Sequence, residues 1–198
     1  METNMPNVKF RPARENECAH LALFADMATR CLASHSWALK AQAGQSAFEV
    51  GRSLIRNDVQ HFTHFSNWRI ADMAGSVVGA INTGVLPQTH VDLQTLPEVL
   101  HSPTELKAIA AGTCYLSSAA IYPEYQGRGL GAALLDEAVS QTHAAGVRQL
   151  TLLVGSFNSR AHKLYLRCGF EEWNRRPFCA FPGSDQTGEW ILMRKEIS

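Results

Sequence analysis

Apolar and polar residues along this chain follow two periods, one typical of strands and one of helices. Near the N-terminus, apolar residues alternate with polar ones from Val8 to Pro12, passing through Phe10, which predicts a short strand. They then recur at helical spacing from Glu15 to Ala33 and, less regularly, from Ala47 to Asp58. The chain therefore opens with a strand followed by two helices.

The middle of the chain predicts a hairpin and then a long connection. Phe62 to Met73 and Ser76 to Leu86 have the composition of strands, and Ala74-Gly75 between them suits a tight turn, so the two should pair antiparallel. The stretch from Pro87 to Ala111 keeps neither period, and we interpret it as a connection with one short helix near Leu106. Connections of that length are often functional.

The pattern of the last 86 residues predicts strands that alternate with helices. An apolar strand is expected from Thr113 to Tyr122, followed by a glycine-rich turn and a helix that ends at Gly146. Gln149 to Val154 predicts a buried strand, a further helix runs from Asn158 to Gly169, and Gly188 to Ile197 supplies a final strand. The helix after the turn should face the core with Leu130, Leu134, Leu135, Ala138 and Val139.

Composition favours one globular domain covering residues 1–198. The chain is 45% hydrophobic and 18% charged, which is enough apolar material for a core and excludes a disordered chain. Eighteen basic and eighteen acidic residues give no net charge, so we expect neither nucleic acid nor an anionic membrane as a partner. A cytoplasmic location is expected, since the five cysteines form no Cys-x-x-Cys pair and no export signal or membrane span is seen.

The segment from Ile121 to Ala132 carries the strongest chemical signal. Gly127, Gly129 and Gly131 lie between the end of a predicted strand and the start of a predicted helix. Glycines let the backbone approach a ligand, and the N–H groups of a helix start attract anions, so a phosphate or pyrophosphate would fit here. Taken alone, such a turn serves equally well for close packing of a helix.

Three phosphate-binding motifs compete for this turn. A P-loop needs a Lys-Ser or Lys-Thr pair that the turn lacks. Gly127-x-Gly129-x-x-Ala132 satisfies a loose dinucleotide fingerprint, but the next strand ends in Gly155-Ser156-Phe157-Asn158 instead of an acidic residue. The third possibility is Gln126-x-x-Gly129-x-Gly131, preceded by Ala120-Ile121-Tyr122-Pro123 and followed by Asn158-x-x-Ala161-x-x-Leu164-Tyr165-x-x-x-Gly169-Phe170.

In this third pattern the chain resembles the GNAT acetyltransferase superfamily, specifically from Thr113 to Glu172. The resemblance implies an α/β (α+β) fold with a mixed, mostly antiparallel sheet of about six to seven strands, splayed parallel strands 4 and 5, and helices on both faces. It also implies acetyl-CoA as cosubstrate, no metal, and a cofactor held between the strand ending at Tyr122 and the strand 149–154. Splayed strands leave backbone groups unpaired, and the amides of the pantetheine arm can satisfy them.

The resemblance assigns the cofactor residues one by one. Backbone groups on the strand would meet the pantetheine arm, and the glycine-rich turn would cradle the pyrophosphate, with a cation added by Arg128. Gln126 would hold the loop or donate to a phosphate. Asn158 would cap its helix and reach the cofactor, although a plain N-cap is an equal possibility. The full set is Ala119, Ala120, Ile121, Gln126, Gly127, Arg128, Gly129, Leu130, Gly131, Ala132 and Asn158.

Tyr165 is the candidate for protonating the departing thiolate, as the resemblance implies, and a core tyrosine is the alternative. Ser117, with Ser118, could orient a water or the substrate or could simply fill the strand, and Tyr115 could line the acceptor side. No carboxylate falls at an unmistakable position for the general base, which stays unassigned.

Other candidates weigh less. His61-x-x-His64 lacks a third metal ligand nearby, and Cys114 is more typical of a core thiol than of a nucleophile. The aromatic group comprising Phe62, Phe65, Trp68, His35 and Trp37 is either core packing or a wall of the acceptor pocket.

The leading functional hypothesis is N-acetylation of a primary amine of a small molecule by direct attack in a ternary complex. Peptide or protein N-terminal acetylation and a non-catalytic acyl-CoA-binding module are the alternatives, and a homodimer is left open. Selectivity should reside in three irregular segments: the loop 34–45, the connection 87–111 and residues 175–188. Their His35, Trp37, Phe178 and Phe181 favour a partly apolar amine over a polyamine.

Overall fold

The computed structural model describes residues 8–88 and 91–197. These residues form two compact units: residues up to Thr83 with Ser118–Glu137, and Gly84–Ser117 with Ala138 onward. The expectation of a single domain stays a prediction. None of the helices in the described part of the chain is long and apolar enough to cross a membrane.

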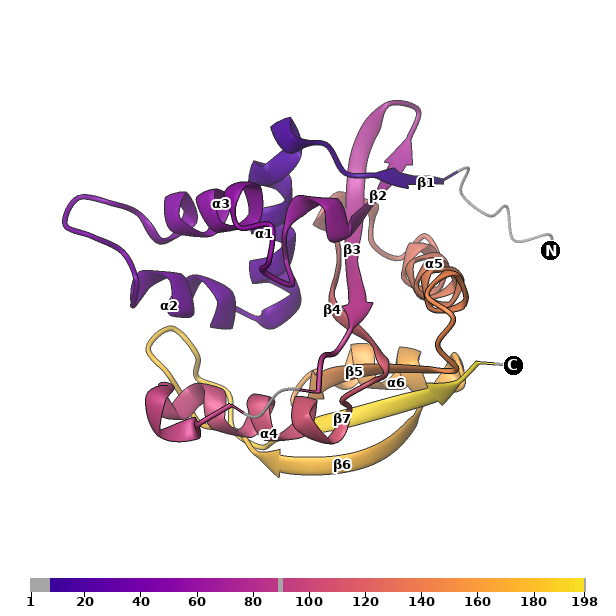
Figure 1. Cartoon of the computed structure of the whole chain (residues 1–198). Coiled ribbons are helices and arrows are strands. Elements are labelled where there is room, and N and C mark those ends of the chain that lie inside the picture. The colour runs from indigo at the N-terminus through magenta and orange to yellow at the C-terminus, as the bar shows by residue number, and fades with distance from the viewer. Residues whose placement is uncertain (1–7, 89–90, 198) are drawn as a thin grey trace. The chain divides into compact units, whose positions relative to one another are not determined.

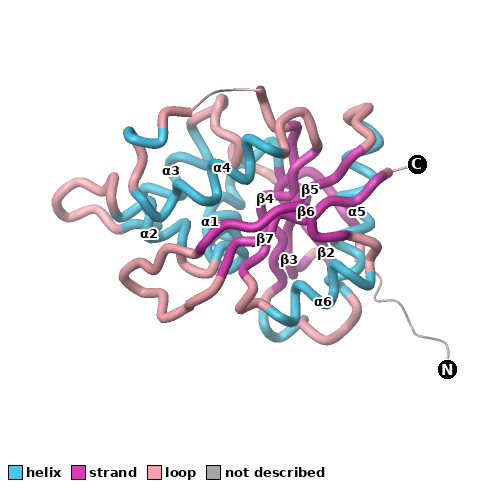
Figure 2. The backbone as a smooth tube through the Cα atoms, turned by 90° about the horizontal axis from the view of Figure 1, so that it is seen from below, coloured by secondary structure: helices cyan, strands magenta, loops and turns pink. Residues whose placement is uncertain are grey.

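Seven strands form one sheet in the order β1-β2-β3-β4-β5-β7-β6. The strands β4 and β5 pair in parallel, while β1 with β2, β2 with β3, β5 with β7 and β6 with β7 pair antiparallel. Figure 1 labels the helices and strands, and Figure 2 colours the same backbone by secondary structure. This mixed sheet confirms the expected fold class. The strands are β1 Lys9–Pro12, β2 Trp68–Met73, β3 Ser76–Val85, β4 Cys114–Ile121, β5 Gln149–Gly155, β6 Glu171–Pro177 and β7 Glu189–Glu196; the helices are α1 Cys18–Thr29, α2 Leu32–Ala38, α3 Ala47–Asn57, α4 His101–Ile109, α5 Leu130–Ala144 and α6 Ser159–Arg167.

The first unit packs α1, α2 and α3 against the strands β2 and β3 and the end of β4 (Figure 1). Its core includes Trp68, Phe24 and Ile55, all fully buried. The hairpin between β2 and β3 turns at Ala74 and Gly75, whose φ angles are 52° and 87°. Positive φ at both central residues matches the right-handed twist of paired strands, which explains the tight turn that the sequence predicts.

The expected single helix from Glu15 to Ala33 is wrong at its C-terminal end. The α1 helix ends at Thr29, Arg30 and Cys31 adopt left-handed conformations (φ 51° and 69°), and the chain restarts as α2 where a loop was expected. Two side chains of α1 accept N–H groups of the next helix. Asp26 Oδ1 accepts from Ser34 N at 2.9 Å and Thr29 Oγ1 from Ala33 N at 3.0 Å. Side-chain acceptors thus compensate for the break in the helix.

The strand expected from Phe62 begins only at Trp68. The preceding residues form turns, because side chains satisfy their carbonyl groups: Trp68 Nε1 donates to Thr63 O at 2.9 Å and Asn82 Nδ2 to Phe62 O at 3.2 Å. These bonds replace the ladder of a strand.

The second unit contains β5, β6 and β7, the beginning of β4, and the helices α4 and α6. Leu150, Leu152 and Leu192 are almost completely buried in its core. The α4 helix confirms the short helix expected near Leu106. The strand β6 was not predicted, since residues 175–188 were expected to be irregular; ion pairs such as Arg194 to Glu171 at 2.7 Å, rather than apolar alternation, link it to β7.

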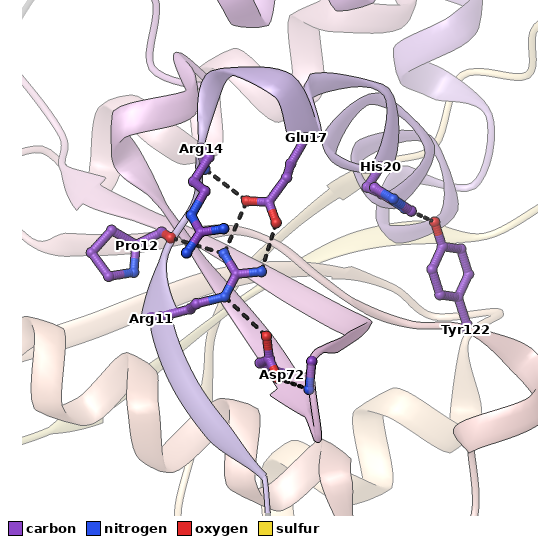
Figure 3. A network of polar contacts seen from close by, with 8 residues as sticks. Arg11, Pro12, Arg14, Glu17, His20, Asp72 and Tyr122 are labelled. Carbon is purple, nitrogen blue, oxygen red and sulfur yellow. Dashed lines mark hydrogen bonds and ion pairs between the residues drawn. The ribbon is translucent and has the colours of Figure 1, made fainter.

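The N-terminal strand is tied to the first unit by a charged network around Arg11 (Figure 3). Arg11 Nη2 donates to Glu17 Oε1 at 2.6 Å and Arg11 Nε to Asp72 Oδ2 at 3.0 Å, and the Arg14 N–H donates to Glu17 at 2.7 Å. The hydrogen bond from Arg11 holds the pKa of Glu17 below its usual range, and it has the same effect on the pKa of Asp72.

Glu17→Gln should destabilise the protein by about 1–3 kcal/mol at pH 7, because it removes the charge that Arg11 and Arg14 share. The lowered pKa means that this contribution is present above pH 4.5 and disappears as the pH falls through the folded-state pKa. Urea unfolding at pH 7 and at about pH 3 measures both. Glu15→Gln is the matched control: its ion pair with Arg56 is exposed and should contribute about 0.5 kcal/mol or less. An equal loss at both pH values would contradict the charge-based account.

Candidate functional site

The end of β4 has one backbone edge that faces away from β3. Tyr122 N donates to Val78 O at 2.9 Å, and a side chain at Gly79 would strike the carbonyl oxygen of Ala120, so these even-numbered positions of β4 face β3. Successive residues of a strand point their N–H and C=O groups to opposite edges. Those of Ala119 and Ile121 therefore point away from β3, where a ligand's amides could pair with them. The Ala120 side chain itself is buried in the core of the first unit.

A short 3₁₀ turn joins β4 to the glycines. Tyr125 N donates to Tyr122 O at 2.9 Å and Gln126 N to Pro123 O at 3.2 Å. The side chain of Gln126 then reaches back, with Nε2 donating to Ile121 O at 3.1 Å. Gln126 thus holds the loop against the end of its own strand, one of the two roles expected for it.

Gly127 and Gly129 give the loop its shape. Their φ angles are 78° and 81°, a region that side chains rarely adopt, and a Cβ atom at either would meet no atom within 4 Å. Of the loop residues after Gln126 that the structure describes, the first N–H with a protein backbone acceptor is that of Ala132, which donates to Gly129 O at 3.1 Å. The preceding N–H groups, at the start of α5, are open to an anion.

The residues that flank these glycines anchor the loop and add charge. Leu130 is buried and fixes the first turn of α5. The Arg128 guanidinium donates to Glu124 O at 3.0 Å and lies 5.3 Å from the centre of the Tyr125 ring. Its side chain is exposed, so it places a cation beside the open N–H groups. Gly131 and Ala132 continue the backbone of that first turn.

In the second unit, pairing of β4 with β5 is registered over three positions of the described chain, from Cys114 with Leu150 to Leu116 with Leu152. Both strands continue beyond this pairing, to Ile121 and Gly155. Ser117 is the first residue of β4 past the paired segment and is half-buried. Its proposed role of orienting a water or substrate stays a prediction.

The helix α6 carries the two other candidates. Asn158 caps it: Asn158 Oδ1 accepts from Ala161 N at 3.4 Å, while its N–H donates to Gly155 O at 2.8 Å. The structure therefore shows the capping role, and contact with the cofactor stays a prediction. Tyr165 lies in the last turn, half-buried, with its ring 5.8 Å from that of Phe170.

Two phenols come together in the second unit. Burial raises the pKa of Tyr165 to about 12. Burial also raises the pKa of Tyr115 on β4, and the neighbouring Tyr165 phenol adds to that rise. Both therefore stay protonated throughout the physiological range, and each can donate a hydrogen bond but not serve as an anionic base.

The aromatic residues divide between core and site. Trp68 and Trp37 are buried in the core of the first unit, where Trp37 fills the space above Gly51. Trp37 therefore belongs to the packing of α2 and α3, and its replacement would test stability. Phe178 is half-buried in the second unit, with ring centres 4.9 Å from Phe157 and 5.5 Å from Trp190, so it remains a candidate for the acceptor side.

The histidine and cysteine candidates make local contacts or are buried. His61 Nδ1 and His64 Nδ1 lie 2.8 Å from Thr63 Oγ1 and Ser66 Oγ, respectively. Cys114 is buried, and burial raises the pKa of its thiol, which leaves it a poor nucleophile. Within residues 8–88 and 91–197, no group of three histidine, cysteine or carboxylate side chains could hold a metal ion.

Comparison with known proteins identifies the family. The family model described as "Acetyltransferase (GNAT) family" matches residues 34–170, more than half of the chain. The chain belongs to the GNAT acetyltransferase family. This membership agrees with the acetyl-CoA motif expected around Gly129.

Curated proteins resemble the chain in sequence, and solved structures resemble it in fold. Over 84 residues the chain is 37% identical to the "[Ribosomal protein bS18]-alanine N-acetyltransferase" of Escherichia coli K12; the match covers 42% of this chain and about half of that protein (55%). The Escherichia coli crystal structure of that enzyme has a TM-score of 0.58 at 19% identity, with 96% and 94% of the two chains covered. The structure of yncA from Salmonella typhimurium with its cofactor acetyl-CoA gives 0.60 at 16% identity, with 97% and 95% covered.

Two features of this chain suit the binding of acetyl-CoA. The open N–H groups between Gly127 and Gly131 suit a pyrophosphate. The backbone groups of Ala119 and the N–H of Ile121, on the β4 edge away from β3, suit amides, whereas the Ile121 carbonyl already accepts from Gln126. Bound acetyl-CoA supplies an activated thioester. In the first unit, backbone donors and Arg128 would bind the phosphates. The role expected for Tyr165, in the second unit, stays a prediction.

Proposed function

We propose that this GNAT acetyltransferase transfers the acetyl group of acetyl-CoA directly to a primary amine of a small, partly apolar molecule. The observation that carries the proposal is the glycine-rich turn after β4, whose open N–H groups precede α5. For the acceptor, support comes from Phe157, Phe178 and Trp190, whose rings form one aromatic cluster in the second unit. The absence of net charge on the chain also disfavours polyamines.

A second candidate is acetylation of a protein or peptide N-terminus. It is favoured by the relative named above, which is a ribosomal-protein alanine N-acetyltransferase. Thiol release from acetyl-CoA against a panel of amines, amino acids and peptides with N-terminal alanine distinguishes the two. A small amine with the highest kcat/KM supports the first proposal, and a peptide preferred by more than about tenfold supports the second. If none of these acceptors causes thiol release, both candidate functions are contradicted.

Phe178→Ala should raise KM for the amine roughly 5–100-fold, as expected for loss of about 1–3 kcal/mol of apolar contact, while KM for acetyl-CoA stays nearly constant. Steady-state kinetics with each substrate varied in turn measures both constants. Val59→Ala, which truncates a side chain that is 68% exposed, is the control for apolar truncation in general. A change in KM for acetyl-CoA alone would place Phe178 outside the acceptor site.

A further inference from the structure

The helix α4 places a lysine over the ring of Tyr115 in the second unit. Lys107 is half-buried, and its Nζ lies 5.7 Å from the centre of the Tyr115 ring, on β4. Tyr115 is in turn the electrostatic neighbour of Tyr165 on α6. These three side chains, which we name the Lys107 cluster, come from three separate elements of the unit. One of them is the residue expected to assist departure of the thiolate.

The charged groups around α4 are already paired with one another. The strands β6 and β7 pack against α4, and their basic side chains have partners. The ion pairs are Arg176 with Glu105, Arg175 with Glu172 and Glu189, and Arg194 with Glu171, while Lys195 Nζ donates a hydrogen bond to Cys168 O. Before Lys107, His101 Nε2 contacts Leu96 O and Glu98 is exposed. Among the described residues, no carboxylate is placed at ion-pair distance from Lys107.

A half-buried ammonium without a counter-ion favours its neutral form. Burial lowers the pKa of Lys107, and the face of the Tyr115 ring compensates only in part for the lost water. A neutral lysine amine is a base, and no other base has been assigned in this chain. The acceptor amine reaches the enzyme mainly as an ammonium ion and must lose a proton before it can attack.

We infer that Lys107 is the general base that takes the proton of the acceptor amine. This inference rests on the proposed function. The proton moves from the acceptor nitrogen to Lys107 Nζ, and the freed lone pair attacks the thioester carbonyl. The new C–N bond forms, the C–S bond breaks with its electron pair on sulfur, and Tyr165 donates a hydrogen bond to that sulfur. The second amine proton neutralises the thiolate through solvent, and Lys107 returns its proton to water.

Two substitutions separate a base from a packing residue. Lys107→Arg keeps a cation over Tyr115 but cannot accept a proton at any physiological pH, and Lys107→Met removes both properties. If Lys107 is the general base, kcat/KM for the amine should fall about tenfold or more in both variants. KM for acetyl-CoA should stay within about threefold of the wild-type value. They should also lose the acidic limb that Lys107 gives the pH profile. Lys163→Arg and Lys163→Met on the exposed side of α6 are the matched controls.

Wild-type kinetics in Lys107→Arg, with turnover intact, would overturn the inference and leave the proposed function standing. If no amine of the panel causes thiol release from acetyl-CoA, the proposed function itself is overturned. Titration of the Lys107 side chain by ¹³C NMR, assigned through Lys107→Arg, decides its ionisation without any turnover. A midpoint below the ordinary lysine value of about 10.4 is expected, and one at or above it would exclude Lys107 as the base.

Discussion

Replacing Gly129 with aspartate should weaken the binding of CoA about 100-fold or more. The new carboxylate would stand among the N–H groups at the start of α5 and repel a pyrophosphate. Two unit charges about 4 Å apart repel by roughly 4 kcal/mol at the effective dielectric constant of a protein surface. Isothermal titration calorimetry with CoA measures the effect, and the difference from wild type should shrink at high salt because the charges are then screened.

Gly129→Asn is the control that isolates the charge. Asparagine has the shape of aspartate and tolerates the left-handed conformation that φ of 81° requires, and a Cβ at this position meets no atom within 4 Å. Both variants should therefore fold, with similar strain. If CoA binds the folded aspartate variant as tightly as the asparagine variant, the turn does not hold the pyrophosphate.

The sequence predicts this part of the molecule well because its signals are local. Glycines mark a turn wherever positive φ is needed, and the helix after the turn has a clear apolar period. Leu130, Leu134, Leu135 and Ala138 are buried as predicted, and Val139 is half-buried. Strand, turn and helix are adjacent in sequence, so one motif specifies their chemistry.

Helix breaks and charged strands escape such reasoning for a physical reason. The apolar period of residues 15–33 continues across Arg30, although Asp26 and Thr29 accept N–H groups of the following segment and stabilise a break there. The strand β6 lacks apolar alternation, since it is joined to β7 by backbone pairing and ion pairs. Neither competition between side chain and backbone nor cross-strand charge is visible in hydrophobic patterning.

The catalytic half of the candidate site depends on tertiary structure. Lys107 stands alone as a cation in Leu-Lys-Ala-Ile-Ala-Ala, which is a weak signal in the sequence. Its meaning comes only from Tyr115 on β4, over whose ring α4 places it, and from Tyr165, the neighbour of Tyr115. Long connections such as 87–111 follow no periodic pattern, and this one carries the residue that the sequence left unassigned.

Tyr165→Phe should lower kcat about 10–1000-fold and leave the binding of acetyl-CoA within a few fold. Phenylalanine keeps the ring against Phe170 and removes only the hydroxyl group. The hydroxyl is used mainly when the thiolate departs, so its loss affects the transition state more than the ground state. Steady-state kinetics and calorimetry, with chemistry shown to be rate-limiting by single-turnover measurements, test both parts.

The raised pKa of Tyr165 defines how it acts. With a pKa of about 12, the phenol is more than three units less acidic than an ordinary thiol at about 8.5, so complete proton transfer to a thiolate is uphill by roughly 5 kcal/mol. Tyr165 should therefore stabilise the sulfur by a hydrogen bond. Because ionisation of this residue begins only near its pKa, kcat should show no loss attributable to Tyr165 up to about pH 10. An alkaline limb that lies below pH 10 and disappears in Tyr165→Phe, or a kcat unchanged by the substitution, would remove Tyr165 from the reaction.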